Sequence, residues 1–196
     1  TTYKLSCTMA TQNIDGFDVA VFNDLNKDSP IYNESIRNAA DEDHERFGLN
    51  VNIREMHGNT DYMRCEHDCS NQLYRAPDPS CDDYFVPTCP KCGDRARPHC
   101  LFFDETYRDE FYQTEGLKEA MESCGALIII GTALQTNLAS KIAHEACNRG
   151  TLVIEINPDP VLKYGNVKCL IAECDSVVPD LVQNLENLWV QFNDVD

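Results

Sequence analysis

Residues 126–160, ALIIIGTALQTNLASKIAHEACNRGTLVIEINPDP, decide the fold class of this 196-residue chain. The stretch opens on a short apolar run that is typical of a buried strand. An amphipathic helix is predicted over 137–149, closed by Gly150, and a second buried strand follows and stops at Pro158. A strand, a helix and a strand in this order predict parallel strands joined by a crossover helix.

The same alternation continues on both sides of this stretch. Residues 116–124 indicate a helix, 168–171 a third short strand, and 177–192 a terminal helix with apolar residues three and four apart. The pattern predicts an α/β fold with a Rossmann-like, doubly wound parallel sheet. Ligands of such sheets bind at the carboxyl ends of the strands, where Gly131 and Asn157 lie.

Two cysteine pairs upstream have the spacing of a zinc site. They are Cys65-x3-Cys69 and Cys89-x2-Cys92, separated by nineteen residues. Four thiolates leave no open coordination position, so we expect a structural zinc ion that holds a small lobe together.

Other interpretations of these cysteines stay open. His67, between the first two cysteines, or Cys81, in the intervening loop, could replace a ligand. A redox role for the second pair is less favoured, because a redox pair belongs at the start of a helix and the flanks here are typical of loops.

Composition limits the classes of partner. The formal charge is −17, from 33 acidic and 16 basic residues, which disfavours direct binding of nucleic acid and favours cationic partners. No apolar run is long enough to span a membrane. The 11 cysteines, an odd number in a chain too large to need disulfides, indicate an intracellular, reducing compartment.

Six short motifs occur in a specific order along the chain. They are TQNIDG (11–16), REMHGN (54–59), RARPHCLFFDE (95–105), GTAL (131–134), EIN (155–157) and AECDSVVPDLV (172–182). With the paired cysteines, this series resembles the sirtuins, NAD-dependent protein lysine deacylases with a Rossmann-type domain and a small zinc lobe. The resemblance covers residues 9–18 and about 52–182.

The resemblance implies a role for each matching residue. His57 would be the general base, and Asn13 and Asp15 would act with it in the nicotinamide and ribose pocket. The acyl-lysine protein or peptide substrate would be clamped by Cys100, Leu101, Phe102, Phe103, Asp104 and Glu105. The remaining NAD contacts would come from Gln12, Ile14, Gly131, Thr132, Ala133, Asn157 and Cys174. Without the resemblance, His57, Asn13 and Asp15 would be interpreted as turn residues.

The chain also departs from the sirtuin pattern. The glycine-rich loop of GAGxS type and the PDFR motif that open the family are absent, so we expect a sheet that is incomplete at its N-terminal strand. An upstream segment or a partner chain would complete it, and the chain alone would be unstable and inactive. Smaller departures are Asp18 for histidine, Asp104 for glycine and Ala133 for serine.

The domain organisation follows from these matches. Residues 1–60 are predicted to belong to the Rossmann-like domain, with a polar, acidic insertion at about 18–50. Residues 61–100 would form the zinc-binding lobe, and 101–196 the remainder of the Rossmann-like domain.

Three functions remain open at this point. The first is a sirtuin-like NAD-dependent protein lysine deacylase, which transfers the acyl group to ADP-ribose and releases nicotinamide. The alternative is a catalytically inactive zinc module derived from a sirtuin, serving as a structural subunit of a larger assembly. Mono-ADP-ribosyl transfer by the same pocket is the third.

Overall fold

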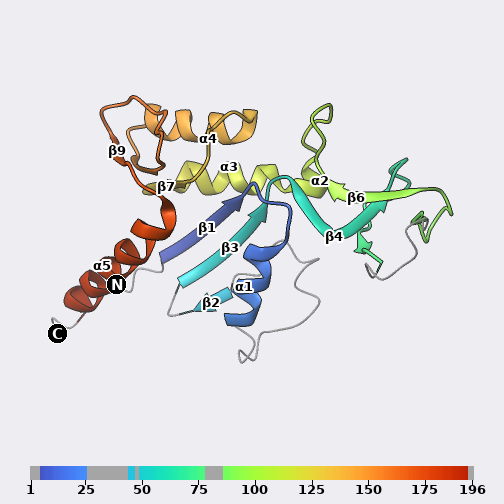
Figure 1. Ribbon diagram of the computed structural model, residues 1–196, viewed down its shortest axis with the longest axis horizontal. Helices are drawn as coiled ribbons and strands as arrows, with labels where there is room; N and C mark the ends of the chain where they lie inside the picture. Colours follow the sequence, from blue (N-terminus) through green and yellow to red (C-terminus); the bar gives the residue numbers. More distant parts are fainter. Residues whose placement is uncertain (1–4, 26–43, 47–48, 78–85, 194–196) are drawn as a thin grey trace. The chain divides into compact units, whose positions relative to one another are not determined.

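The computed structural model describes residues 5–25, 44–46, 49–77 and 86–193 (Figure 1). The chain divides into two compact units, Thr1–Leu117 and Lys118–Asp196. The described residues form three sheets of three strands each. The domain boundaries given above stay a prediction, because these units follow a different division.

A parallel strand pair organises the start of the first unit. Strand β1 (Leu5–Thr11) pairs along its whole length with β3 (Leu49–Glu55), and β2 (His44–Arg46) adds antiparallel to the other side of β3 (Figure 1). Thr11 is the register partner of Glu55, so the two strands end side by side. The segments that follow, residues 12–16 and 56–58, therefore leave the sheet at the same end, the carboxyl end of the two parallel strands.

The predicted acidic insertion at about 18–50 contains regular structure. Helix α1 (Phe17–Leu25), β2 and the start of β3 fall within it, and residues 26–43 and 47–48 lie outside the described part of the chain. Sequence reasoning missed β3, although LNVNI alternates apolar and polar residues with the period of a strand.

An antiparallel sheet forms the cysteine-bearing part of the first unit. Strand β4 (Gly58–Cys65) lies between β5 (Tyr74–Arg75) and β6 (Ala96–Cys100). Gly58, at the start of β4, is the partner of Cys100, at the end of β6. The segment after β6 consequently begins beside the turn that joins β3 to β4.

Two helices follow β6. Helix α2 (Asp109–Tyr112) is a single turn, and α3 (Thr114–Ser123) leads toward the second unit. Tyr112 and Phe111 of α2 are buried. The α3 helix matches the helix predicted over 116–124.

The second unit has the predicted alternation of strands and helices. Its parallel sheet is ordered β7 (Ala126–Ile130), β8 (Leu152–Ile156) and β9 (Val167–Leu170). Helix α4 (Asn137–Asn148) connects β7 to β8, and α5 (Cys174–Asn193) ends the described chain. These elements confirm the predictions, with α5 beginning three residues before the predicted start.

Strand β8 is the centre of this second sheet. Val153 and Ile156 are fully buried, and so is the carboxylate of Glu155. Glu155 accepts hydrogen bonds from the backbone N–H groups of Val161 (2.8 Å) and Leu162 (3.1 Å), which compensates its burial. The loop after β8 is thereby fixed to the strand.

Within the described residues, β1 pairs with β3 alone and β7 pairs with β8 alone, so each is the edge strand of its own sheet. Among the same residues, no helix is long and apolar enough to cross a membrane.

Candidate functional site

His57 lies in the turn between β3 and β4 and contacts two other segments. Its Nδ1 is 3.2 Å from the backbone oxygen of Gln12, and its Nε2 is 3.0 Å from the hydroxyl of Tyr107. Its own carbonyl accepts a hydrogen bond from the N–H of Leu101 at 2.9 Å. The half-buried imidazole is thus held between the loop after β1 and the segment after β6.

Gly58 explains why His57 can approach β6 this closely. Its φ is +80°, and a Cβ at this position would lie 1.9 Å from the backbone oxygen of His99. Only glycine is compatible with both the left-handed backbone and the contact. The close approach of two strands therefore determines where the preceding histidine lies.

The loop after β1 places the predicted pocket residues beside His57. Its backbone is fixed by hydrogen bonds from Met56 N–H to Thr11 (2.9 Å) and from Thr60 N–H to Ile14 (2.8 Å). Asn13, Ile14 and Asp15 are exposed there. The structure therefore brings 12–15 and His57 together at one sheet edge.

Two acidic side chains of this region have structural partners. Asp15 accepts the N–H of Phe17 at 3.0 Å and so supports the start of α1, as a turn-forming residue does. Asp18 accepts the hydroxyl proton of Thr11. An acceptor at position 18 thus stabilises the loop after β1.

The predicted peptide segment begins buried and becomes exposed. Cys100 is buried at the end of β6, whereas Phe102 and Phe103 extend into solvent. Asp104 is also exposed. A peptide could reach the aromatic rings and the backbone of this turn, but not the thiol of Cys100.

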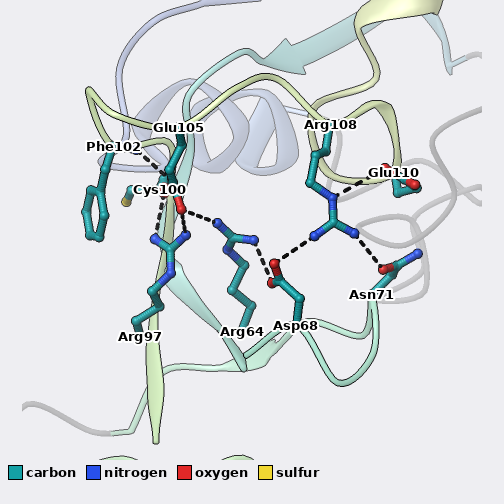
Figure 2. A network of polar contacts seen from close by, with 9 residues as sticks. All are labelled: Arg64, Asp68, Asn71, Arg97, Cys100, Phe102, Glu105, Arg108 and Glu110. Atoms are coloured by element: carbon teal, nitrogen blue, oxygen red, sulfur yellow. Dashed lines mark hydrogen bonds and ion pairs between the residues drawn. The ribbon is translucent and has the colours of Figure 1, made fainter. Parts of the chain in front are cut away.

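Glu105 belongs to a network of ion pairs that shapes this turn (Figure 2). Its carboxylate accepts hydrogen bonds from Arg64 (3.0 Å), from Arg97 and from the backbone N–H of Phe102 (2.9 Å). Arg97 also donates to the carbonyl of Cys100 at 3.1 Å. The Glu105 side chain therefore fixes the turn from within rather than facing a ligand.

The network continues toward the cysteine pairs. Asp68, located between the ligand candidates Cys65 and Cys69, accepts from Arg64 (2.8 Å) and from Arg108 (2.7 Å), as Figure 2 shows. Both guanidinium groups also lie over the ring of Phe111, at 4.7 and 4.6 Å from its centre. Arg64 consequently connects Glu105 of the turn 101–105 to Asp68, which lies between the first two cysteines.

The four predicted metal ligands converge. The sulfur atoms of Cys65, Cys69, Cys89 and Cys92 lie within 4.8 Å of one another. Closest are Cys69 and Cys89 at 3.5 Å and Cys65 and Cys92 at 3.6 Å. Tetrahedral zinc with Zn–S bonds of about 2.3 Å separates its sulfurs by about 3.8 Å, so the cluster fits a structural zinc ion.

The Cys89 thiol of the second pair is favoured to ionise, whereas the pKa of Cys92 is raised by burial and by its side-chain contacts with Cys65 and Cys89. Backbone N–H groups of Cys92 and Lys91 lower the pKa of the Cys89 thiol to about 7. His67 is exposed and pairs with Asp94 at 3.5 Å, and it is not in the cluster. Cys81, the other alternative ligand, lies outside the described residues.

The other predicted NAD contacts lie at the strand ends of the second unit. Gly131 follows β7 with φ of +62° and open space around the position of a Cβ. Asn157 follows β8, and its amide donates to the carbonyl of Thr132 at 2.9 Å. Ala133 is exposed. These residues gather where ligands of parallel sheets bind, and the open backbone at Gly131 suits the close approach of a nucleotide.

Cys174 is exposed and begins α5, the helix that follows the end of β9. It therefore lies after a third strand of the same parallel sheet, in the second unit. Gln12–Asp15 and His57 lie in the first unit.

A model of the Sir2 family matches residues 20–137, more than half of the chain. The chain belongs to the Sir2 family.

Relatives and solved structures agree with this assignment. A protein of Mycobacterium tuberculosis named NAD-dependent protein deacylase is 30% identical over 153 residues, which cover 76% of this chain and 62% of the relative. This chain therefore spans about three fifths of the length of that curated Sir2 relative.

Two solved structures share the fold of this Sir2 chain. A mutant Sir2 homologue in complex with ADP-ribose has a TM-score of 0.67 at 22% identity, covering 93% of this chain and 61% of the other. A Sir2–p53 peptide–NAD+ structure has a TM-score of 0.56 at 17% identity, covering 92% and 93%. The predicted sirtuin resemblance and Rossmann-like fold are thus confirmed.

Sequence reasoning missed Tyr107, Arg64 and Asp68. Tyr107 lies 50 residues from its partner His57 in the sequence, and Arg64 lies 41 residues from Glu105. Neither pair forms a local pattern. The one available signal is that Tyr107 comes two residues after the matched motif 95–105.

Proposed function

We propose that this chain is the larger part of a NAD-dependent protein lysine deacylase of the Sir2 family, with His57 as its general base. The observation that carries the proposal is the position of the imidazole. It lies between the loop of Gln12 and the segment that begins at Leu101, where a cofactor and a peptide would meet.

The reaction needs a base that works at neutral pH. Bound NAD would supply the ADP-ribosyl group for transfer to the acyl oxygen of the substrate, with nicotinamide as the leaving group. His57 would then accept a proton from a ribose hydroxyl, a general-base role that imidazole commonly has in enzymes. Asn13 and Asp15, exposed in the loop beside His57, would contact nicotinamide and the ribose.

Seven further residues are proposed to contact NAD. Gln12 and Ile14 belong to the first unit, and Gly131, Thr132, Ala133, Asn157 and Cys174 to the second. An upstream segment or a partner chain would complete the sheet and provide the phosphate-binding loop that these motifs do not include.

The acyl-lysine peptide would bind along residues 100–105. The exposed rings of Phe102 and Phe103 offer apolar contacts, and an extended peptide could pair with the backbone of this segment. The relative named NAD-dependent protein deacylase supports an acylated protein as the class of substrate, by analogy. Zinc at the four cysteines would stabilise the lobe that carries the segment and would take no part in the chemistry.

The test compares the full-length native protein with its His57→Ala variant on an acetyl-lysine peptide. We expect deacylation that requires NAD and falls at least about 100-fold in the variant. NAD affinity, measured by isothermal titration calorimetry, should change less than about threefold. Deacylation without NAD, or deacylation unaffected by His57→Ala, would overturn the proposal.

The same titration tests the alternative function. A native protein that binds zinc but shows no measurable NAD binding would be the inactive structural module. Specific NAD binding with transfer of ADP-ribose to protein, and no deacylation, would instead identify the mono-ADP-ribosyl transferase.

A further inference from the structure

We propose that Tyr107 is a positioning residue for His57, which holds the imidazole in the tautomer whose Nε2 carries no proton. This inference rests on the proposed role of His57 as the base. The observation behind it is a pair of contacts that leave only one arrangement of protons on the neutral ring.

The first contact favours one position of the ring proton. The backbone oxygen of Gln12, 3.2 Å from Nδ1 of His57, can only accept a hydrogen bond. The contact is therefore a hydrogen bond only in the tautomer that carries the proton on Nδ1. In the neutral imidazole, Nε2 is then the acceptor.

The second contact uses that acceptor. The hydroxyl of Tyr107, 3.0 Å from Nε2, must donate its proton to the ring. Burial raises the pKa of Tyr107, which keeps the phenol protonated and able to donate. The basic nitrogen of His57 is thus oriented by a hydroxyl before any substrate arrives.

Tyr107 is well placed to hold this position. Its neighbours in the chain, Glu105 and Arg108, are both anchored in the ion-pair network, through Arg64 and Asp68 respectively (Figure 2). Its ring also packs edge-on against Tyr112, with 6.0 Å between the ring centres. The hydroxyl therefore has a defined direction.

The chain offers a matched control in Tyr112. Its hydroxyl is buried and has no hydrogen-bond partner among the described residues. Replacement by phenylalanine at 107 and at 112 removes the same atom from two adjoining tyrosines. Only the replacement at 107 removes a contact to His57.

The experiment measures the tautomer of His57 directly. Native protein labelled with 15N-histidine is studied by NMR at a pH where imidazoles are neutral, and the His57 signals are assigned with His57→Gln among the 5 histidines. We expect Nδ1 to carry the proton in the wild type. In Tyr107→Phe the population with the proton on Nε2 should rise, and Tyr112→Phe should match the wild type.

Kinetics give a second readout. For Tyr107→Phe we expect kcat to fall about tenfold, the equivalent of one hydrogen bond, with KM for NAD within about twofold. Tyr112→Phe should retain the wild-type kcat. Circular dichroism verifies that both variants are folded.

Two results would overturn the inference. One is a His57 tautomer that is the same in Tyr107→Phe as in the wild type, and the other is an equal change in Tyr112→Phe. The NMR measurement needs no turnover, so an inactive wild type would refute the proposed function while the tautomer still decides the role of Tyr107.

Discussion

Backbone space at Gly58 determines where the His57 imidazole lies. We predict that Gly58→Ala lowers the free energy of unfolding by at least about 3 kcal/mol, because the new Cβ would lie 1.9 Å from the oxygen of His99 and the left-handed backbone adds strain. Urea denaturation followed by circular dichroism measures the effect.

Gly150→Ala is the control for this prediction. Gly150 has a similar φ of +78°, but a Cβ there would meet nothing within 4 Å. Only the backbone strain of roughly 1–2 kcal/mol should remain. Equal losses of unfolding free energy at the two positions would show that the contact with His99 does not affect stability.

His99 gives the fold a dependence on pH. Burial, with the charge of Arg97, lowers its pKa to about 4 from the ordinary 6.5. Between these pH values the unfolded chain binds a proton that the folded chain does not, so stability falls as the pH is lowered. We predict a loss of about 2–3 kcal/mol across this window.

Denaturation of wild type and His99→Phe at several pH values checks the prediction. The stability of His99→Phe should change less with pH than that of the wild type, because the variant has no imidazole at this site. The same substitution at the exposed His144 is the control. A slope that also shrinks in His144→Phe would contradict the assignment to His99.

At the scale of elements, the arginine network connects β4, the first cysteine pair and the turn after β6. Arg64 is the central member, with 4% of its side chain exposed and contacts to Asp68 and Glu105. We predict that Arg64→Met costs about 2–3 kcal/mol of stability, since two partly buried carboxylates lose a buried partner. Chemical denaturation measures it.

Arg95→Met is the matched control for Arg64→Met. Arg95 also pairs with a carboxylate, that of Glu66, but their side chains are 68% and 36% exposed. An exposed pair of this kind contributes less than about 1 kcal/mol. A cost at Arg95 as large as at Arg64 would mean that burial is not what gives the network its strength.

At the scale of the whole molecule, the two units differ in their dependence on zinc. We predict that removal of zinc by a chelator raises hydrogen exchange in β4 and β6 and leaves β8 protected, because all four thiols lie in the first unit. Hydrogen-exchange mass spectrometry of the native protein measures this. Cys89→Ser should have the same effect without a chelator.

Cys169→Ser controls for the loss of a thiol as such. Cys169 is an exposed cysteine of the second unit and belongs to no cluster of ligands in the described part of the chain. The Cys169→Ser variant should retain the zinc content and the hydrogen-exchange pattern of the wild type. Equal loss of protection in both units on chelation would contradict a zinc site that supports only its own lobe.

Prediction from sequence succeeded where the signal was local. The apolar runs of β7 and β8 and the helix between them were located within one or two residues. The first parallel pair was missed, because the alternation of apolar and polar residues in β1 (LSCTMAT) is short, from Leu5 to Met9, and most residues of the strand are small. An edge strand with exposed residues does not need an apolar pattern.

The sequence by itself determined the α/β class, the four candidate metal ligands and the Sir2 motifs, because each depends on residue types at short, regular spacing. Only the tertiary structure decided that His57 meets Gln12 and Tyr107, and that Glu105 faces arginines rather than a ligand. These contacts join residues about 40 to 50 positions apart. Which side chains meet over such separations depends on strand register and on the space left at Gly58, and neither is encoded in local sequence.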